Sequence, residues 1–219
     1  AEFNMKLKRI DIQQAYNSFG AIEKLAPIAE KTSGRFWVNF DLPTRLMDDL
    51  SPDYPTMNGG GSLRTSEITV ENVNSLNKIA DALQMPDLKR LLLSPVDLSF
   101  KISDGKVNVD PFDIKYQDMK ATISGWTSLD QDIEYDMKLT VPRKKFGGAA
   151  NDALQNLVEE ANRLGTDFSL GENVSINIKI TGTVTDPKIK TVLGKSAGKN
   201  IFEDLKNQAE DELKKQKEK

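Results

Sequence analysis

Residues 133–141, IEYDMKLTV, place an apolar side chain at every second position and a polar side chain between each pair. Such strict alternation is typical of a β-strand that has one face in a core and the other in water. The same alternation recurs in 96–102 (VDLSFKI) and in 174–180 (VSINIKI). Asp104-Gly105, which follows residues 96–102, is a dipeptide preferred in two-residue hairpin turns because both central residues need a positive φ. These patterns predict antiparallel hairpins that share one apolar face.

Helical spacing of apolar residues appears in three segments, 11–26, 75–93 and 149–164. Pro86 divides the second segment, because proline lacks the amide donor that a helix interior needs. We therefore expect one helix before Pro86 and a short second helix at Asp87–Leu93. Each of these helices has an apolar stripe that could pack on the sheet.

The fold class expected from these elements is α+β, an antiparallel meander with about four amphipathic helices. Residues 43–61 are dense in proline, glycine and asparagine and are predicted to form a loop. The charged tail, 196–219, has a helical pattern with a thin apolar stripe. No linker rich in glycine and serine interrupts the remainder, so we expect one domain over 1–195 followed by this tail.

The composition excludes several classes of site. The 219 residues include no histidine and no cysteine, which rules out imidazole-based triads, thiolate nucleophiles and zinc sites built from these ligands. Lys plus Arg is 30 and Asp plus Glu is 33, giving a net charge of −3, which is too balanced for a typical nucleic-acid binder. Apolar runs such as Leu91–Leu93 are too short to span a bilayer. If the protein is membrane-anchored, the anchor lies outside this sequence.

Motifs for catalysis or metal binding are incomplete. Gly194-Lys195-Ser196 looks like the end of a phosphate-binding loop, but the required glycine five positions earlier is replaced by Ile189. Alternating carboxylates in 130–136 lack the glycine of a calcium loop, where Tyr135 stands instead. A hydrolase would need two facing carboxylates of raised pKa in a cleft. We therefore expect no enzyme, no cofactor and no resident metal.

The apolar face of the sheet allows two interpretations. The helices could seal it into a closed core, which the pattern alone favours because large exposed apolar surfaces are uncommon on soluble proteins. Alternatively, part of the face could stay open to acyl chains. The inward positions that would contact a lipid in that case are Phe100, Ile102, Ile123, Met137, Leu139, Ile176, Ile178 and Ile180.

Several segments also share an order with a known family. A glycine-rich strand start at 58–63 precedes a helix, then PVDLSF at 95–100 and the hairpin at 104–109. GTVTDPKI at 182–189 follows the last alternating strand. In this order residues 58–194, and to a lesser extent residues 1–57, resemble the C-terminal region of the AsmA family of envelope proteins.

This resemblance implies a non-enzymatic protein of the Gram-negative cell envelope that takes part in outer-membrane assembly and lipid homeostasis. AsmA-like proteins are typically tethered to the inner membrane by an N-terminal helix and project into the periplasm. They are similar to bridge-type lipid-transfer proteins, whose curved β-sheets pass phospholipid acyl chains along an apolar inner face. The resemblance thus implies a curved sheet here, phospholipid as a partner, and an anchor that this sequence lacks.

The second functional hypothesis is a closed structural or assembly module. Its surfaces, including the tail 196–219, would bind other envelope proteins, since the thin apolar stripe of the tail could dock on a partner. The two hypotheses differ in one structural respect: whether the apolar face is covered.

Overall fold

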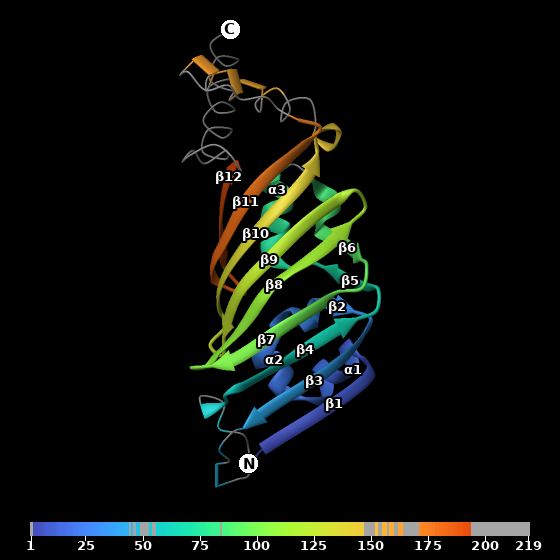
Figure 1. Cartoon of the computed structure of the whole chain (residues 1–219), viewed down its shortest axis with the longest axis vertical. Coiled ribbons are helices and arrows are strands. Elements are labelled where there is room, and N and C mark those ends of the chain that lie inside the picture. The colour runs from blue at the N-terminus through green and yellow to red at the C-terminus, as the bar shows by residue number, and fades with distance from the viewer. Residues whose placement is uncertain are drawn as a thin grey trace.

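A computed structural model of the chain describes residues 2–43, 56–83, 85–146 and 171–193, with single positions between 45 and 53 and between 152 and 163. Its main feature is an open nine-stranded antiparallel sheet in the order β1-β3-β4-β7-β8-β9-β10-β11-β12 (Figure 1). The strands are β1 (Glu2–Asp11), β3 (Arg35–Pro43), β4 (Gly59–Thr65), β7 (Asp97–Ser103), β8 (Lys106–Tyr116), β9 (Met119–Ser128), β10 (Asp132–Pro142), β11 (Asn173–Thr183) and β12 (Pro187–Leu193).

The turn between β7 and β8 confirms the predicted hairpin. Asp104 and Gly105 have φ values of 51° and 68°, the left-handed conformation that the dipeptide favours. Further along β8 the register shifts between Val109 and Phe112. At this bulge Asp110 and Pro111 stand opposite the single residue Ser124, so Phe112 returns to the same face as Val109. Pro111 is tolerated there because ladder pairing is interrupted.

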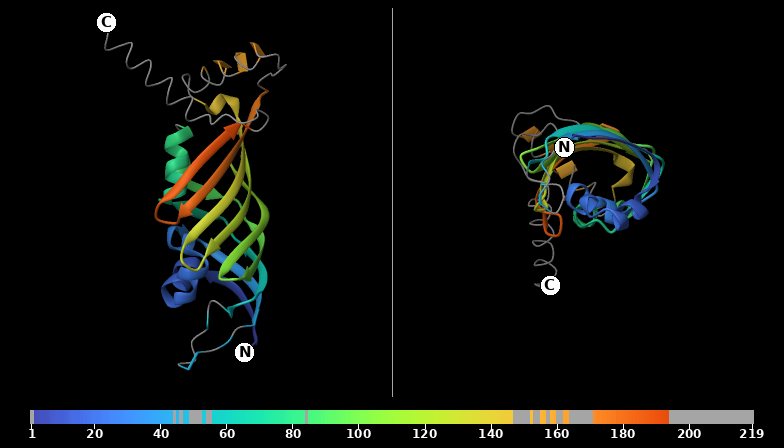
Figure 2. Two further views of the ribbon diagram at one scale, coloured as in Figure 1. Left: turned by 90° about the vertical axis from the view of Figure 1, so that its left-hand side faces the viewer. Right: turned by 90° about the horizontal axis from the view of Figure 1, so that it is seen from below.

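The sheet is strongly curved, and the remaining elements lie on its concave side (Figure 2). A second, three-stranded sheet has the order β2-β5-β6. Its strands and the helices are β2 (Thr32–Ser33), β5 (Ile68–Glu71), β6 (Arg90–Leu93), α1 (Ile12–Ser18), α2 (Gly20–Leu25), α3 (Asn74–Leu83) and the 3₁₀ turns η1 (Pro27–Lys31), η3 (Pro86–Lys89) and η4 (Arg143–Lys145).

The predicted helices are only partly correct. The described residues contain three α-helices rather than about four. The helix expected over 11–26 is divided at Phe19, whose extended backbone separates α1 from α2 and leaves its side chain 57% exposed. The helix expected at Asp87–Leu93 is wrong, because η3 is followed there by strand β6. The helix expected at 149–164 and the tail 196–219 lie outside the continuously described residues.

The expected loop at 43–61 is shorter than predicted, because Gly59, Gly60 and Gly61 belong to β4 and pair with β7, and Gly60 and Gly61 also pair with β3. A β-carbon at Gly61 would lie 2.2 Å from the carbonyl oxygen of Asn39, so the close approach of two strands requires glycine here. The glycines therefore extend the sheet instead of ending it.

The core joins the concave face to its cover. One cluster of buried residues includes Ile176 and Ile178 from β11, Ile79 from α3 and Leu91 from β6. The opposite, convex face is polar and carries cross-strand ion pairs, such as Lys179 with Glu134 at 2.7 Å. Prediction of a one-sided apolar sheet is thus confirmed for the described strands.

Candidate functional site

The eight residues proposed from the sequence to contact lipid all lie on the concave face. Met137 is the register partner of both Ile123 and Ile178, and Leu139 pairs with Ile176, so these residues form adjoining cross-strand rows. Phe100 and Ile123 are half-buried. The other six are less than 9% exposed: Ile102, Met137, Leu139, Ile176, Ile178 and Ile180.

The cover over these residues comes from three elements. Helix α3 packs on β12, strand β6 packs on β8, and α2 approaches β9. Ile79 of α3 is 2% exposed and belongs to the same buried cluster as Ile178. The C-terminal strands of the sheet are therefore in a closed core in this structure, whereas the middle strands keep apolar side chains that are only partly covered.

One row of residues crosses the concave face on all nine strands, and we call it the axial row. Each member is the register partner of the next, so the row runs across the strands along the long axis in Figure 1. At about 4.8 Å per strand, its eight steps make it about 38 Å long. Its members are Met5, Phe40, Gly61, Phe100, Val109, Gly125, Tyr135, Ile180 and Ile189.

The axial row is apolar and incompletely covered. Among the described side chains of the row only Ile180, at 6% exposure, is fully buried. The half-buried side chains are Phe40, Phe100, Val109, Tyr135 and Ile189. Partly exposed apolar side chains that adjoin one another cost free energy unless something covers them. The row is thus one continuous part of the concave face with apolar surface still available for contact.

Two members of the row are glycines. Gly61 lies between Phe40 and Phe100, and Gly125 lies between Val109 and Tyr135. A β-carbon at Gly125 would be 2.2 Å from the carbonyl oxygen of Glu134 and 2.6 Å from Cδ1 of Tyr135, so no larger residue fits. The ring of Tyr135 therefore lies close against the glycine backbone.

A hydrogen bond fixes the Tyr135 ring. Its phenol oxygen is 2.8 Å from Oγ1 of Thr127, which is itself only 6% exposed. Burial raises the pKa of the Tyr135 phenol above its usual range, while the hydrogen bond to Thr127 acts in the opposite direction. The phenol is therefore neutral at physiological pH, and the polar end of the ring is satisfied inside the apolar face.

Phe40 and Phe100 also belong to a second buried cluster at this edge of the sheet. It contains Met57, Ile102 and Val107, and Leu25 of α2 packs against it. The N-terminal helices thus cover one end of the row and α3 covers the other.

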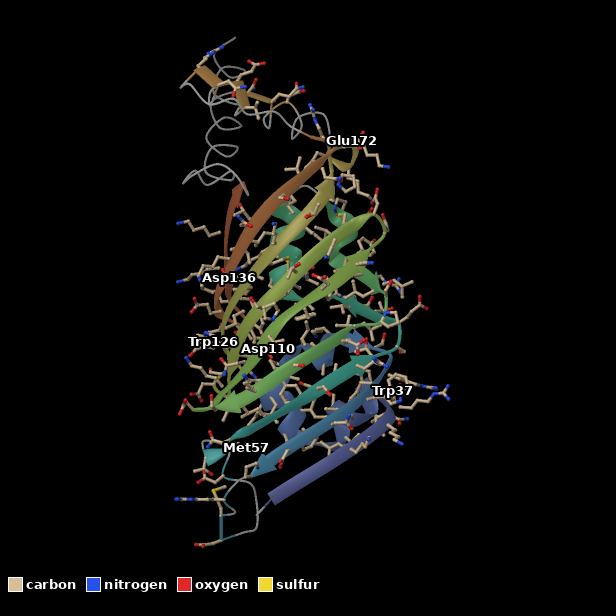
Figure 3. The ribbon with its side chains drawn as sticks, viewed as in Figure 1. Trp37, Met57, Asp110, Trp126, Asp136 and Glu172 are labelled. Atoms are coloured by element: carbon tan, nitrogen blue, oxygen red, sulfur yellow. The ribbon has the colours of Figure 1, made fainter. Side chains whose placement is uncertain are left out.

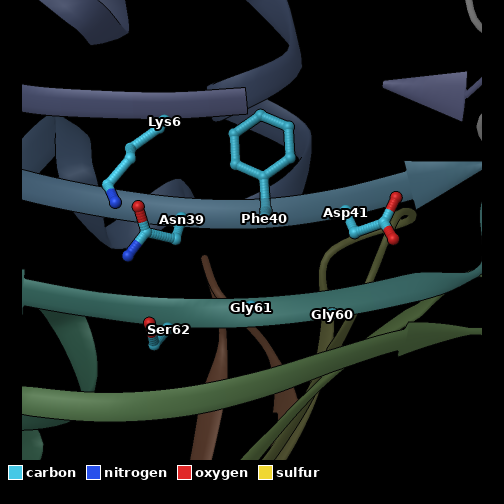
Figure 4. Close-up of a pocket in the computed structure, with 7 residues that line it drawn as sticks. All are labelled: Lys6, Asn39, Phe40, Asp41, Gly60, Gly61 and Ser62. Atoms are coloured by element: carbon cyan, nitrogen blue, oxygen red, sulfur yellow. The ribbon is translucent and has the colours of Figure 1, made fainter. Parts of the chain in front are cut away.

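The convex face offers a different kind of surface. A shallow hollow of about 440 Å³ (Figure 4) is lined by Lys6, Asn39, Asp41, Gly60 and Ser62 of this face and by Phe40 and Gly61 of the axial row. Its side chains mix one cation, one anion, neutral polar groups and the ring of Phe40. Elsewhere on this face the ammonium of Lys106 lies 3.8 Å from the ring centroid of Trp126, and Trp126 and Asp136 are labelled in Figure 3.

Sequence reasoning identified the concave parity but missed most of the axial row. Phe40, Gly61, Val109, Gly125 and Tyr135 were not among the proposed contacts. A row depends on the register between strands, and the insertion of β4 between β3 and β7 cannot be read from alternation. Register between distant strands has no local signal in the sequence.

Among the described residues, no three carboxylate, imidazole or thiol side chains gather where they could share a metal ion. No helix within that part of the chain combines the length and hydropathy needed to cross a membrane. Comparisons of the chain with protein-family models, with curated proteins and with solved structures gave no match.

Proposed function

We propose that this chain is a non-enzymatic segment of a Gram-negative cell-envelope protein that holds or passes phospholipid acyl chains along the axial row. The observation that carries the proposal is the row itself, an apolar cross-strand line on nine strands whose side chains are mostly half-buried. Acyl chains are apolar and unbranched, so they suit a long, narrow apolar surface and gain free energy from burial there.

The resemblance to AsmA-like proteins supports a place for this activity. In that setting the protein is periplasmic, tethered to the inner membrane by a segment outside this sequence, and takes part in outer-membrane assembly and lipid homeostasis. Within the described residues β1 and β12 are the edge strands of the sheet, and such an arrangement is compatible with one segment of a longer path.

A second candidate is a closed structural module that binds envelope proteins. The specific observation in its favour is that six of the eight proposed contact residues are buried, each with less than 9% of its surface exposed. In this case the concave face serves only as a core, and the function resides on the polar outer surface.

The test uses two neighbouring residues of β8 that face opposite sides. Val109 belongs to the axial row, whereas Asn108 is the register partner of Lys101 and Trp126 on the convex side. Protein purified from a Gram-negative host is examined by native mass spectrometry, with extraction and identification of any bound phospholipid. We expect Val109→Asp to bind at least about tenfold less lipid than the wild-type protein, because a carboxylate in an apolar contact is costly. Asn108→Asp should bind as much lipid as the wild-type protein.

Thermal unfolding of both variants checks that they remain folded. A wild-type protein that is stable and free of lipid would overturn the acyl-chain proposal and favour the closed module. Equal lipid content in the two variants would show that bound lipid lies elsewhere than on the row.

A further inference from the structure

The contacts of α3 divide into two groups with different partners. On one side, Asp81 forms an ion pair with Lys89 of η3 at 2.6 Å. The backbone amide of Met85 also donates a hydrogen bond to the carbonyl of Ala80. These contacts hold α3 within its own segment, between β5 and β6. On the other side, α3 reaches across to the hairpin turn between β11 and β12, more than 100 residues later in the chain.

Three polar contacts make this second group, which we call the clasp. The side-chain amide nitrogen Nδ2 of Asn74 donates to the carbonyl of Thr185 at 3.0 Å. The ammonium of Lys78 donates to Oδ1 of Asp186 at 2.9 Å and to the carbonyl of Pro187 at 2.6 Å. The clasp is at the surface, since the side chains of Lys78 and Asp186 are 48% and 76% exposed. Solvent and salt therefore weaken it more readily than a buried contact.

The clasp adjoins the C-terminal end of the axial row. Ile189, the last member of the row, is two residues beyond Pro187 on β12, the strand on which α3 packs. Figure 2 shows α3 alongside the β11–β12 hairpin. Ile79, Ala80 and Leu83 of α3 are all less than 9% exposed and complete the cover on this side.

The packing of α3 near the clasp is imperfect. Oδ1 of Asn77 on α3 and Oγ1 of Thr191 on β12 are both buried with no hydrogen-bond partner among the described residues. Thr191 is 0% exposed and is the register partner of Ile178, so its hydroxyl is within the apolar face. Buried polar atoms without partners oppose the closed arrangement, because each could be hydrated if α3 moved away.

The flanks of α3 are suited to such a movement. Asn72, just before the helix, has a φ of 58°, and Pro86 follows its end. Both positions separate α3 from regular structure on either side, and hinge motions concentrate at element ends of this kind.

We propose that α3 is a displaceable cover over the C-terminal end of the axial row, held closed by the clasp between Lys78 and the β11–β12 turn. The inference rests on the proposed function, since its ligand is the acyl chain assigned to the row. An acyl chain that enters at the β12 edge displaces α3 and covers the apolar positions that the helix covered. The internal contacts of the β5–β6 segment stay intact while the clasp opens.

The experiment locks and releases α3 in the same protein. The chain has no cysteine, so Asn74→Cys combined with Thr185→Cys creates the only two thiols. A short bifunctional thiol reagent with a reducible linker joins them and fixes α3 to the hairpin. The matched control joins Asp81→Cys to Lys89→Cys, which fixes α3 to η3 and leaves the clasp free.

Each protein is incubated with vesicles of phosphatidylethanolamine and phosphatidylglycerol that contain a phospholipid with a fluorescent acyl chain. The vesicles are removed by flotation, and the label bound to the protein is measured before and after reduction of the linker. We expect loading of the Asn74–Thr185 cross-linked protein to rise at least about tenfold on reduction, while loading of the control stays unchanged.

The outcomes separate the two proposals. Equal loading of the locked and released protein would overturn the displaceable cover and leave the lipid-binding function intact. A similar loss with both cross-links would also overturn it, because the clasp would then have no special role. Loading in neither protein, before or after reduction, would overturn the proposed function and the cover with it.

Discussion

The ring of Tyr135 lies against the backbone of Gly125, its register partner on β9, with Cδ1 only 2.6 Å from where a β-carbon at 125 would stand. The same ring reaches Thr127, two residues further along β9, through a hydrogen bond of 2.8 Å. An aromatic ring thus replaces the missing side chain of a strand glycine and compensates for its weak strand propensity. This arrangement determines three predictions.

Substitution of Gly125 should destabilise the protein. Gly125→Ala places a β-carbon 2.2 Å from the carbonyl oxygen of Glu134, and the φ of 153° already favours glycine. We expect a loss of about 2–4 kcal/mol in the free energy of unfolding, measured by urea titration. Gly20→Ala is the control, because a β-carbon at that position meets nothing within 4 Å, and we expect a change below about 0.5 kcal/mol. Equal effects of the two substitutions would contradict the steric explanation.

Removal of the Tyr135 hydroxyl should cost less. Tyr135→Phe keeps the ring over Gly125 but leaves the hydroxyl of Thr127 unpaired at 6% exposure. We expect a loss of about 1–2 kcal/mol in the free energy of unfolding, the range for a buried polar group without a partner. Tyr116→Phe, on the half-buried end of β8, should change stability by less than about 0.5 kcal/mol. An unchanged free energy of unfolding in Tyr135→Phe would show that Thr127 finds another hydrogen-bond partner.

Tyr135 should ionise at a higher pH than an exposed tyrosine. Burial raises its pKa above 10.0, so the folded state holds the phenol proton after the unfolded state has lost it. The contribution of Tyr135 to stability is therefore complete below pH 10 and is lost as the pH rises through the folded pKa. The ultraviolet absorbance of the wild-type protein is followed as the pH rises, and that of Tyr135→Phe is subtracted from it. The difference should give a single titration curve with a midpoint above pH 10. A midpoint at or below 10 would contradict burial of the phenol.

The sequence was sufficient for strands whose two faces differ in polarity. In 96–102, 133–141 and 174–180 the alternation predicts both the strand and its inward side, and Asp104-Gly105 predicts the hairpin, because each signal is local. The N-terminal cap of α1 is equally local: Asp11 accepts a hydrogen bond from the amide of Gln14 at 2.9 Å.

Where the local pattern is ambiguous, the prediction failed. Leu91, Leu92 and Leu93 were assigned to a helix, but β6 buries the first and third and leaves Leu92 59% exposed. The alternation was hidden because the residue that faces solvent is also apolar. Pairing of β6 with β5 determines the outcome, and tertiary pairing of this kind overrides helix propensity. The axial row was inaccessible for the related reason that register between distant strands is a non-local property.

The clasp gives the last prediction, which concerns acid. The ammonium of Lys78, by hydrogen bonding and by its charge, lowers the pKa of Asp186 below 3.8, and Lys188 acts in the same direction. Because the folded pKa is depressed, the contribution of the pair is present above pH 3.8 and is lost as the pH falls through the folded value. We expect Lys78→Met to lower the melting temperature at pH 6 in low salt, with the difference from wild type shrinking below pH 3.8 and in high salt.

Hydrogen exchange of the β11–β12 turn supplies the control. Lys89→Met, which breaks the ion pair with Asp81 instead, should leave this exchange unchanged, whereas Lys78→Met should accelerate it. Identical exchange in the two variants would mean that the turn is held by apolar packing alone, and Lys78 would then not be the residue that keeps α3 closed.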